Sequence, residues 1–434
     1  MQKILDKYKK SNKAISITLI IALFLIALFR ESGSEQGSSI EFLMDLFIIL
    51  LSTKVFGIFS KKVQMPAVVG ALLAGLIFGP ACLNKIHETD FLSKISELGV
   101  IVIMFTAGLE VEIKELKKCG KASFIIALLG VITPLVGGFL LTSIINNSGS
   151  IFNLSSSQLL ENIFMGVILT ATSVSITVEV LKELGKINTK VGNTIIAAAL
   201  IDDILGIIAL TLVTSLADPT VNVLLVLGKI IAFFIFVGIV GIIANKLFMS
   251  WMEKSEKGLR RHIILSFCLC LALSYIAEEW FGVADITGAF IAGVILSNVS
   301  KEIYLNKRFE ILSYMLLTPV FFASIGLKVQ LTSITPAMLI FTAGLLFVAF
   351  ASKIVGCYLA GRMNKFNKKD SLRIGIGMMA RGEVALIIAN KGSALGLMNE
   401  TYFTPLIIMV IVAAVSTPIL LKLVFKSKKE QVSN

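Results

Sequence analysis

The stretch IIAAALIDDILGIIAL, residues 195–210, is the most informative part of this sequence. It places Asp202 and Asp203 side by side near the middle of an apolar run that is long enough to cross a bilayer. A carboxylate at that depth costs about 2.5 to 3.5 kcal/mol on insertion scales. Two adjacent carboxylates therefore predict a site that handles ions or protons, with a partner elsewhere in the membrane.

The composition indicates a polytopic, all-α membrane protein. Hydrophobic residues make up 56% of the 434-residue chain, and the mean hydropathy is +0.90, which exceeds what a soluble domain shows. Apolar runs recur from end to end, and the alternating strands of a β-barrel are absent. The net charge of +12 does not require a nucleic-acid partner, because Lys and Arg gather in the cytoplasmic loops of membrane proteins.

Little in the sequence suggests a cofactor or a resident metal. The five cysteines match no zinc or haem spacing, and we interpret them as packing residues. No nucleotide-binding glycine motif is present. We therefore expect no cofactor.

Apolar runs of about 20 residues each predict fourteen membrane spans. They lie near 14–29, 41–60, 65–80, 92–109, 121–146, 160–181, 190–215, 221–245, 260–280, 284–298, 308–326, 335–361, 371–392 and 402–424. The first run could be a signal peptide, since it follows a basic start, but no convincing cleavage site follows it and a retained helix is favoured. In either case the chain after residue 35 begins outside.

The distribution of charge predicts the orientation. With the N-terminus in the cytoplasm, the inner segments hold 31 Lys and Arg residues and the outer loops hold 4. Such a bias is typical of a correct topology, because one missed span would invert every later loop. The C-terminus is then also cytoplasmic.

This topology predicts an inverted repeat. The six spans within 41–215 start outside, and the six within 260–424 start inside, with one helix between them. Two equal blocks of opposite orientation are the arrangement of inverted-repeat transporters. The predicted divisions are an extra helix or signal-like segment at 1–35, a first repeat at 36–215, a linking helix at 216–250, a second repeat at 251–425 and a short cytoplasmic tail at 426–434.

The fifth span of each block is interrupted by small or polar residues. The first contains LTATSVSITVE (169–179), and the second contains GIGMMARGEVAL (375–386). We predict two crossing broken helices, which would expose backbone carbonyls and amides at mid-membrane. The alternative is an unbroken helix whose hydroxyls bond to their own backbone.

The charged residues of these spans suggest a division of roles. On a helix Asp202 and Asp203 point about 100° apart, so one can meet a fixed cation while the other faces a water-filled cavity. Lys353 is the best candidate for that cation, although its side chain could instead reach the inner surface. Arg381 and Glu383 are predicted to have a structural role, neutralising helix ends or bonding to other segments at the second break.

Oxygen ligands for an alkali cation are also available. A dehydrated alkali cation prefers hard oxygen ligands, and Asp203, backbone carbonyls and the hydroxyl of Thr172 or Ser173 would suit it. Protons compete for the same carboxylates. If the cation leaves only when protons bind, one site gives obligatory exchange.

Several motifs occur together in order along the chain. They are TATSVSITVE, AALIDDILG, TGAFIAGVILSN, TPVFFASIGLKVQL, the Lys353 span and MMARGEVALIIANKG. Over about residues 41 to 425 the chain resembles the monovalent cation:proton antiporter-2 family, and more narrowly the NapA-type sodium/proton antiporters with an NhaA-like fold. The span at 14–29 is a departure from that family.

The resemblance implies a mechanism and roles for single residues. Members have a dimerisation domain and a mobile core that moves like an elevator. Asp203 would be the principal carrier of cations and protons, Asp202 would pair with Lys353, and Thr172 would lie close to the ion. Members with both aspartates and the lysine typically exchange two protons for one sodium, which is electrogenic.

We therefore predict a Na⁺ (or Li⁺)/H⁺ antiporter, homodimeric and embedded in the cell membrane, and not an enzyme. A K⁺/H⁺ or broad-cation antiporter is a close alternative. A cation channel or membrane sensor is an alternative from another class, but the fixed charge of Lys353 would oppose cation conduction. His87 and His262 form no catalytic cluster with a nucleophile.

Overall fold

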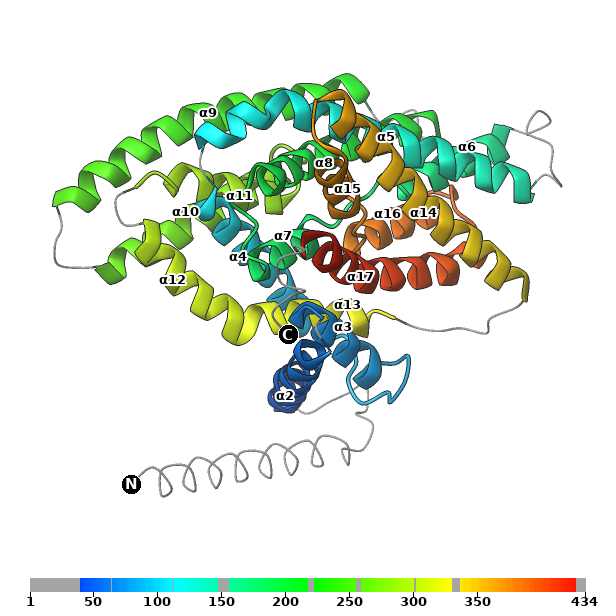
Figure 1. Ribbon diagram of the computed structural model, residues 1–434, viewed down its shortest axis with the longest axis horizontal. Helices are drawn as coiled ribbons and strands as arrows, with labels where there is room; N and C mark the ends of the chain where they lie inside the picture. Colours follow the sequence, from blue (N-terminus) through cyan, green and yellow to red (C-terminus); the bar gives the residue numbers. More distant parts are fainter. Residues whose placement is uncertain are drawn as a thin grey trace. The chain divides into compact units, whose positions relative to one another are not determined.

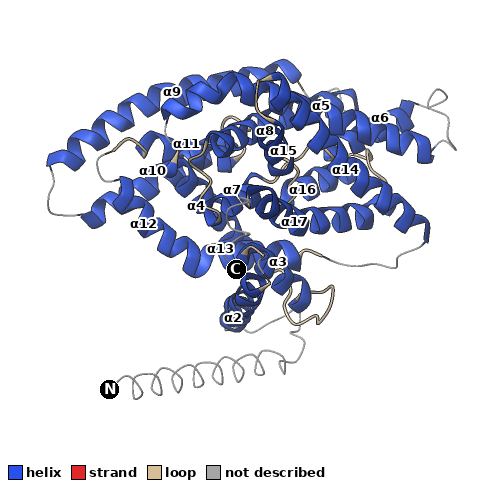
Figure 2. Ribbon diagram, viewed as in Figure 1, coloured by secondary structure: helices blue, strands red, loops and turns tan. Residues whose placement is uncertain are grey.

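The computed structural model describes residues 40–63, 65–111, 113–146, 156–217, 222–254, 259–299, 302–329 and 336–426. Within these ranges the regular structure is helical, and no strand is present (Figures 1 and 2). The predicted span at 14–29 and nearly all of the predicted tail at 426–434 lie outside the described residues. Nine described helices are long and apolar enough to cross a membrane, which confirms the predicted fold class.

The helices follow the predicted spans to within a few residues, except at the start of α5, the end of α9 and the start of α12. The first block contains α2 (Glu41–Lys62), α3 (Ala67–Phe78), α4 (Asp90–Glu110), α5 (Ile113–Asn146), α6 (Ser156–Ile168), α7 (Val174–Glu183) and α8 (Lys190–Ala217). A single long helix, α9 (Val223–Lys254), follows. The second block contains α10 (Leu259–Glu279), α11 (Asp285–Leu296), α12 (Glu302–Leu312), a π-helical turn (Ser313–Leu317), α13 (Thr318–Leu327), α14 (Pro336–Met363), α15 (Lys368–Gly377), α16 (Glu383–Ala394) and, after a short 3₁₀ turn (Glu400–Tyr402), α17 (Phe403–Phe425).

The two fifth spans are broken, as predicted. The chain leaves the helix between α6 and α7 at residues 169–173, and between α15 and α16 at residues 378–382. The backbone N–H of Ser173 donates to the carbonyl of Ala380 at 2.8 Å, so the two breaks are in direct contact. The alternative of an unbroken, back-bonded helix was wrong.

The chain forms two compact units, which we describe separately. The first contains α2, α3, the first turns of α4, and α13. Here α3 packs against α2 and α13, and the hydroxyls of Ser96 and Ser324 share a hydrogen bond of 2.6 Å. This unit holds none of the predicted site residues.

The second unit contains the rest of the chain and every predicted site residue. Helix α5 packs against α6, α8 and α14, and α14 packs against α15 and α17. Apolar side chains such as Phe164, Leu345 and Met409 form a buried cluster beside the breaks. The compact units group helices from both halves of the sequence, and the division into repeats remains a prediction.

Close helix packing in the second unit depends on glycine. A Cβ placed on Gly108 of α4 would meet the carbonyl of Phe290 on α11, and a Cβ on Gly293 of α11 would meet the carbonyl of Phe105. The two helices therefore pack backbone against backbone. Small residues at such contacts are typical of membrane helices, where association depends on close packing.

Candidate ion-binding site

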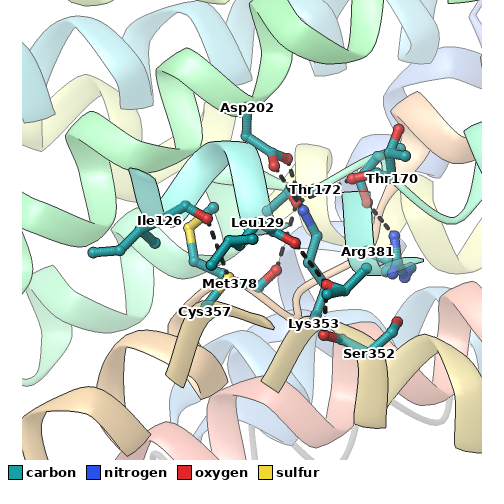
Figure 3. A network of polar contacts seen from close by, with 12 residues as sticks. Ile126, Leu129, Thr170, Thr172, Asp202, Ser352, Lys353, Cys357, Met378 and Arg381 are labelled. Atoms are coloured by element: carbon teal, nitrogen blue, oxygen red, sulfur yellow. Dashed lines mark hydrogen bonds and ion pairs between the residues drawn. The ribbon is translucent and has the colours of Figure 1, made fainter. Parts of the chain in front are cut away.

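The two adjacent aspartates of α8 have different surroundings, and Asp202 is the buried one. Its carboxylate accepts two hydrogen bonds from the ammonium group of Lys353 on α14, at 2.7 Å to Oδ1 and 3.0 Å to Oδ2 (Figure 3). The side chains of Lys353 and Asp202 are 0% and 1% exposed. Lys353 therefore does not reach the inner surface. Charges buried this deeply are stable only when they are paired in this way.

Asp203 has no such partner. The residue is partly exposed, but its Oδ2 atom is buried and has no hydrogen-bond partner among the described residues. A buried carboxylate oxygen without a partner is costly. Asp203 would therefore gain free energy by binding a cation or a proton, whereas Asp202 is already paired.

The first break brings hydroxyl groups to this region. Thr172 is buried, and its hydroxyl lies 3.4 Å from the carbonyl of Thr170 and 3.5 Å from that of Met378 in the second break. Both contacts are long, so this hydroxyl is held only weakly by the protein. Ser173 is also buried, and its hydroxyl lies 3.3 Å from that of Ser175.

The second break contributes a buried cation. Arg381 is fully buried, and its guanidinium donates to the carbonyl of Ala171 in the first break and, at 3.4 Å, to that of Ala349 on α14. The guanidinium thus lies against the first break, just beyond the carboxyl end of α6, where the helix dipole favours a positive charge. Glu383 begins α16, but its side chain lies outside the described residues.

The charges of the described side chains of the site balance when all of them are ionised. Asp202 and Asp203 carry two negative charges, and Lys353 and Arg381 carry two positive ones. Arg381 is close enough to Asp202 for their charges to interact. One monovalent cation or one proton on Asp203 changes the net charge by the same amount, so the arrangement allows the two to replace each other.

Three contacts were missed in the sequence. The hydroxyl of Thr177 on α7 donates to the carbonyl of Gly377 at the end of α15, at 2.7 Å. Glu110 at the end of α4 accepts from Lys182 of α7 at 3.1 Å and from Asn306 of α12 at 3.0 Å. Their signals in the sequence are the hydroxyl residues of the interrupted stretch at 169–179, which include Thr177, and the polar residues at the ends of spans. Neither signal identifies the partners.

Comparison with known proteins identifies the family. The family model described as "Sodium/hydrogen exchanger, transmembrane" matches residues 46–427, which is most of the chain. This protein belongs to the sodium/hydrogen exchanger family. It is therefore a multi-pass membrane protein of a transporter family and not an enzyme.

Two curated members of the exchanger family resemble the chain over nearly its whole length. The Na(+)/H(+)-K(+) antiporter GerN of Bacillus cereus is 37% identical over 392 residues, covering 89% of this chain and 97% of GerN. The probable Na(+)/H(+) antiporter GerT of the same organism is 38% identical over 388 residues, covering 88% and 99%. The solved structure of the sodium proton antiporter MjNhaP1 from Methanocaldococcus jannaschii matches with a TM-score of 0.63 at 19% identity, covering 88% of this chain and 95% of that one, which shows a shared fold.

Proposed function

We propose that this protein exchanges Na⁺ for H⁺ across the membrane, with Asp203 as the carrier. The observation that carries the proposal is the contrast between two adjacent carboxylates. Asp202 is buried and paired with Lys353, whereas Asp203 is partly exposed and keeps a buried oxygen without a partner among the described residues. The antiporter names of GerN and GerT support the same activity.

The cation would be held by oxygen atoms from α8 and the first break. Asp203 supplies the charge, and the weakly held hydroxyl of Thr172, together with Ser173 and bared carbonyls, supplies neutral ligands. A proton on Asp203 removes the charge that holds the cation. Binding of one species therefore releases the other, and no second pathway is needed.

Exchange would be electrogenic, as in NapA-type members. Replacement of one Na⁺ by one proton on Asp203 moves no net charge, so a second proton is required. The pair of Asp202 and Lys353 is a titratable group beside the carrier and can supply it when the pair opens. Each net charge would then couple transport to the membrane potential by about 2.3 kcal/mol per 100 mV.

The ion site would be open to each side of the membrane in turn, through an elevator-like movement of the broken helices together with α8 and α14. The protein would act as a homodimer in the plasma membrane, with its C-terminus in the cytoplasm. Arg381 would have a structural role in this core, since its guanidinium joins the first break to α14. Glu383, the first residue of α16, is proposed to have a structural role at the second break.

A K⁺/H⁺ or broader cation exchange is the second candidate. It is favoured by the name of GerN, which includes K⁺. The choice between the two candidates is therefore part of the experiment.

The test uses purified protein in vesicles that contain a pH-sensitive dye. Addition of Na⁺, Li⁺ or K⁺ should each reveal whether that cation drives proton movement, and an imposed membrane potential should change the rate. The variant Asp203→Asn should abolish the signal, because an amide cannot carry a proton or balance the cation. Asp90→Asn, which alters an exposed carboxylate at the start of α4, is the matched control and should exchange normally. Full exchange by Asp203→Asn would refute the proposal.

A further inference from the structure

A polar bridge joins the end of α7 to α4 and α12. Lys182 of α7 donates to Glu110, the last residue of α4, and the two charged atoms lie 3.1 Å apart. Glu110 also accepts from the side-chain amide of Asn306 on α12, at 3.0 Å. The side chains of Lys182 and Glu110 are only 17% and 15% exposed, so salt and water screen this pair less than they screen a pair on the open surface.

Lys182 provides the attraction in a contact that would otherwise be repulsive. Glu179 of α7 lies close enough to Glu110 on α4 and to Glu310 on α12 for their charges to interact. It also interacts with Lys182 and Glu183 of its own helix. Of these described groups only Lys182 is positive. Without it, carboxylates of α7 would face carboxylates of α4 and α12, and like charges brought together repel.

The bridge connects two separate groups of helices. Helix α7 packs against α8 and α17. Helix α4 packs against α11 through glycine, and the ring of Phe105 on α4 lies edge-on to that of Phe309 on α12, with centroids 4.9 Å apart. Within the described residues, neither α4 nor α12 packs closely along α7. The polar bridge is therefore a main tie between α7 and these two helices.

The bridge lies at the closed end of α8. Only a short loop separates α7 from α8, so Lys182 and the start of α8 share one end of the second unit. Residues 191–199 of α8 are all buried, which covers every face of the helix, whereas residues 203–210 are each partly exposed. Asn193 in the buried half has an Oδ1 atom without a partner among the described residues. Water could satisfy this atom if the closed end opened.

We propose that Lys182 and Glu110 form a latch that holds this end of the ion path closed, and that the latch breaks each time the site opens there. The inference rests on the proposed function, in which the broken helices move together with α8. It adds the residues that hold one of the two states, and it assigns no ion to them. Asn306 is a positioning residue that holds the carboxylate of Glu110 toward Lys182.

The first experiment locks the latch. In a background whose five cysteines are replaced, Glu110→Cys and Lys182→Cys are joined by a short bifunctional thiosulfonate, which a reductant removes. Exchange in vesicles should fall at least tenfold on cross-linking and return on reduction. Lys94→Cys with Glu97→Cys is the matched control, because it replaces an exposed ion pair within α4 alone, and its cross-link should not slow exchange.

Two outcomes of this experiment would overturn the latch. One is exchange at the full rate by protein cross-linked between positions 110 and 182, since the contact would then not need to break. The other is failure of the two cysteines to cross-link, since the ends of α4 and α7 would then not meet as the bridge requires.

The second experiment needs no transport. With Asn193→Cys in the same background, the rate of labelling by a water-soluble maleimide in detergent reports how often the closed end of α8 opens. Lys182→Gln should raise this rate several-fold, whereas Lys182→Arg keeps the charge and should leave it low. Lys94→Gln, which breaks the exposed pair of α4, is the control and should change nothing. Equal labelling with and without Lys182→Gln would contradict the latch.

The two readouts separate this inference from the proposed function. If Lys182→Gln speeds labelling but the unmodified protein exchanges no cation, the latch stands and the proposed function fails. If exchange is normal and persists in the protein cross-linked between positions 110 and 182, the proposed function stands and the latch fails.

Discussion

The two broken helices share a backbone plan but differ in chemistry. The first break, at residues 169–173, carries the hydroxyls of Thr170, Thr172 and Ser173. The second, at residues 378–382, has no hydroxyl side chain and carries the guanidinium of Arg381 instead. The two breaks thus provide neutral oxygen atoms in one case and a fixed positive charge in the other.

The contacts between the breaks explain this difference. Arg381 donates to the carbonyl of Ala171, so the second break restrains the first. The hydroxyl of Thr172 makes only long contacts, and its oxygen remains available to a ligand. We infer that the second break holds the structure together while the first binds the ion. Three substitutions test this division, in order of decreasing effect.

Arg381→Ala should have the largest effect, and it should act on stability. The change removes a buried cation beside Asp202, leaves the carbonyl of Ala171 without its donor and opens a cavity. The cost is about 3 to 5 kcal/mol, as for other broken buried charge networks. Tm in detergent should fall sharply, and little folded protein should be recovered. Arg381→Lys keeps the charge and should recover part of the loss; an unchanged Tm in Arg381→Ala would contradict a structural role.

Thr172→Val should affect binding more than stability. Valine has nearly the same shape, and the two long hydrogen bonds that it removes contribute little to folding. Loss of one neutral ligand should raise the apparent KM for Na⁺ about tenfold, which corresponds to about 1.4 kcal/mol. Thr142→Val is the control, because its hydroxyl donates to Gly138 within α5 at 2.6 Å. If both variants keep the normal KM, the first break is not the ligand-bearing one.

Much of this arrangement was predictable because burial of charge in a membrane restricts the alternatives. A lysine in the middle of an apolar span needs a carboxylate partner, and Lys353 has Asp202. Clusters of hydroxyls, or of Arg and Gly, within an apolar span predicted both breaks. The sequence could not identify the acceptors of Arg381 or the partners of Glu110. Those depend on which helix faces meet, and hydropathy is nearly the same on every face of an apolar helix.

Thr177→Val should have the smallest effect of the three. Its hydroxyl donates to the carbonyl of Gly377 at the end of α15, so it joins the two broken helices but lies outside both breaks. Removal of one buried hydrogen bond costs about 1 kcal/mol, which should lower Tm by no more than a few degrees. The rate of exchange and the KM for Na⁺ should stay normal. A loss of Na⁺ affinity as large as that of Thr172→Val would show that hydroxyls beyond the first break also contribute to the ion site. The ion-binding part would then include α7 as well as the first break, and the contrast would no longer lie between the two breaks alone.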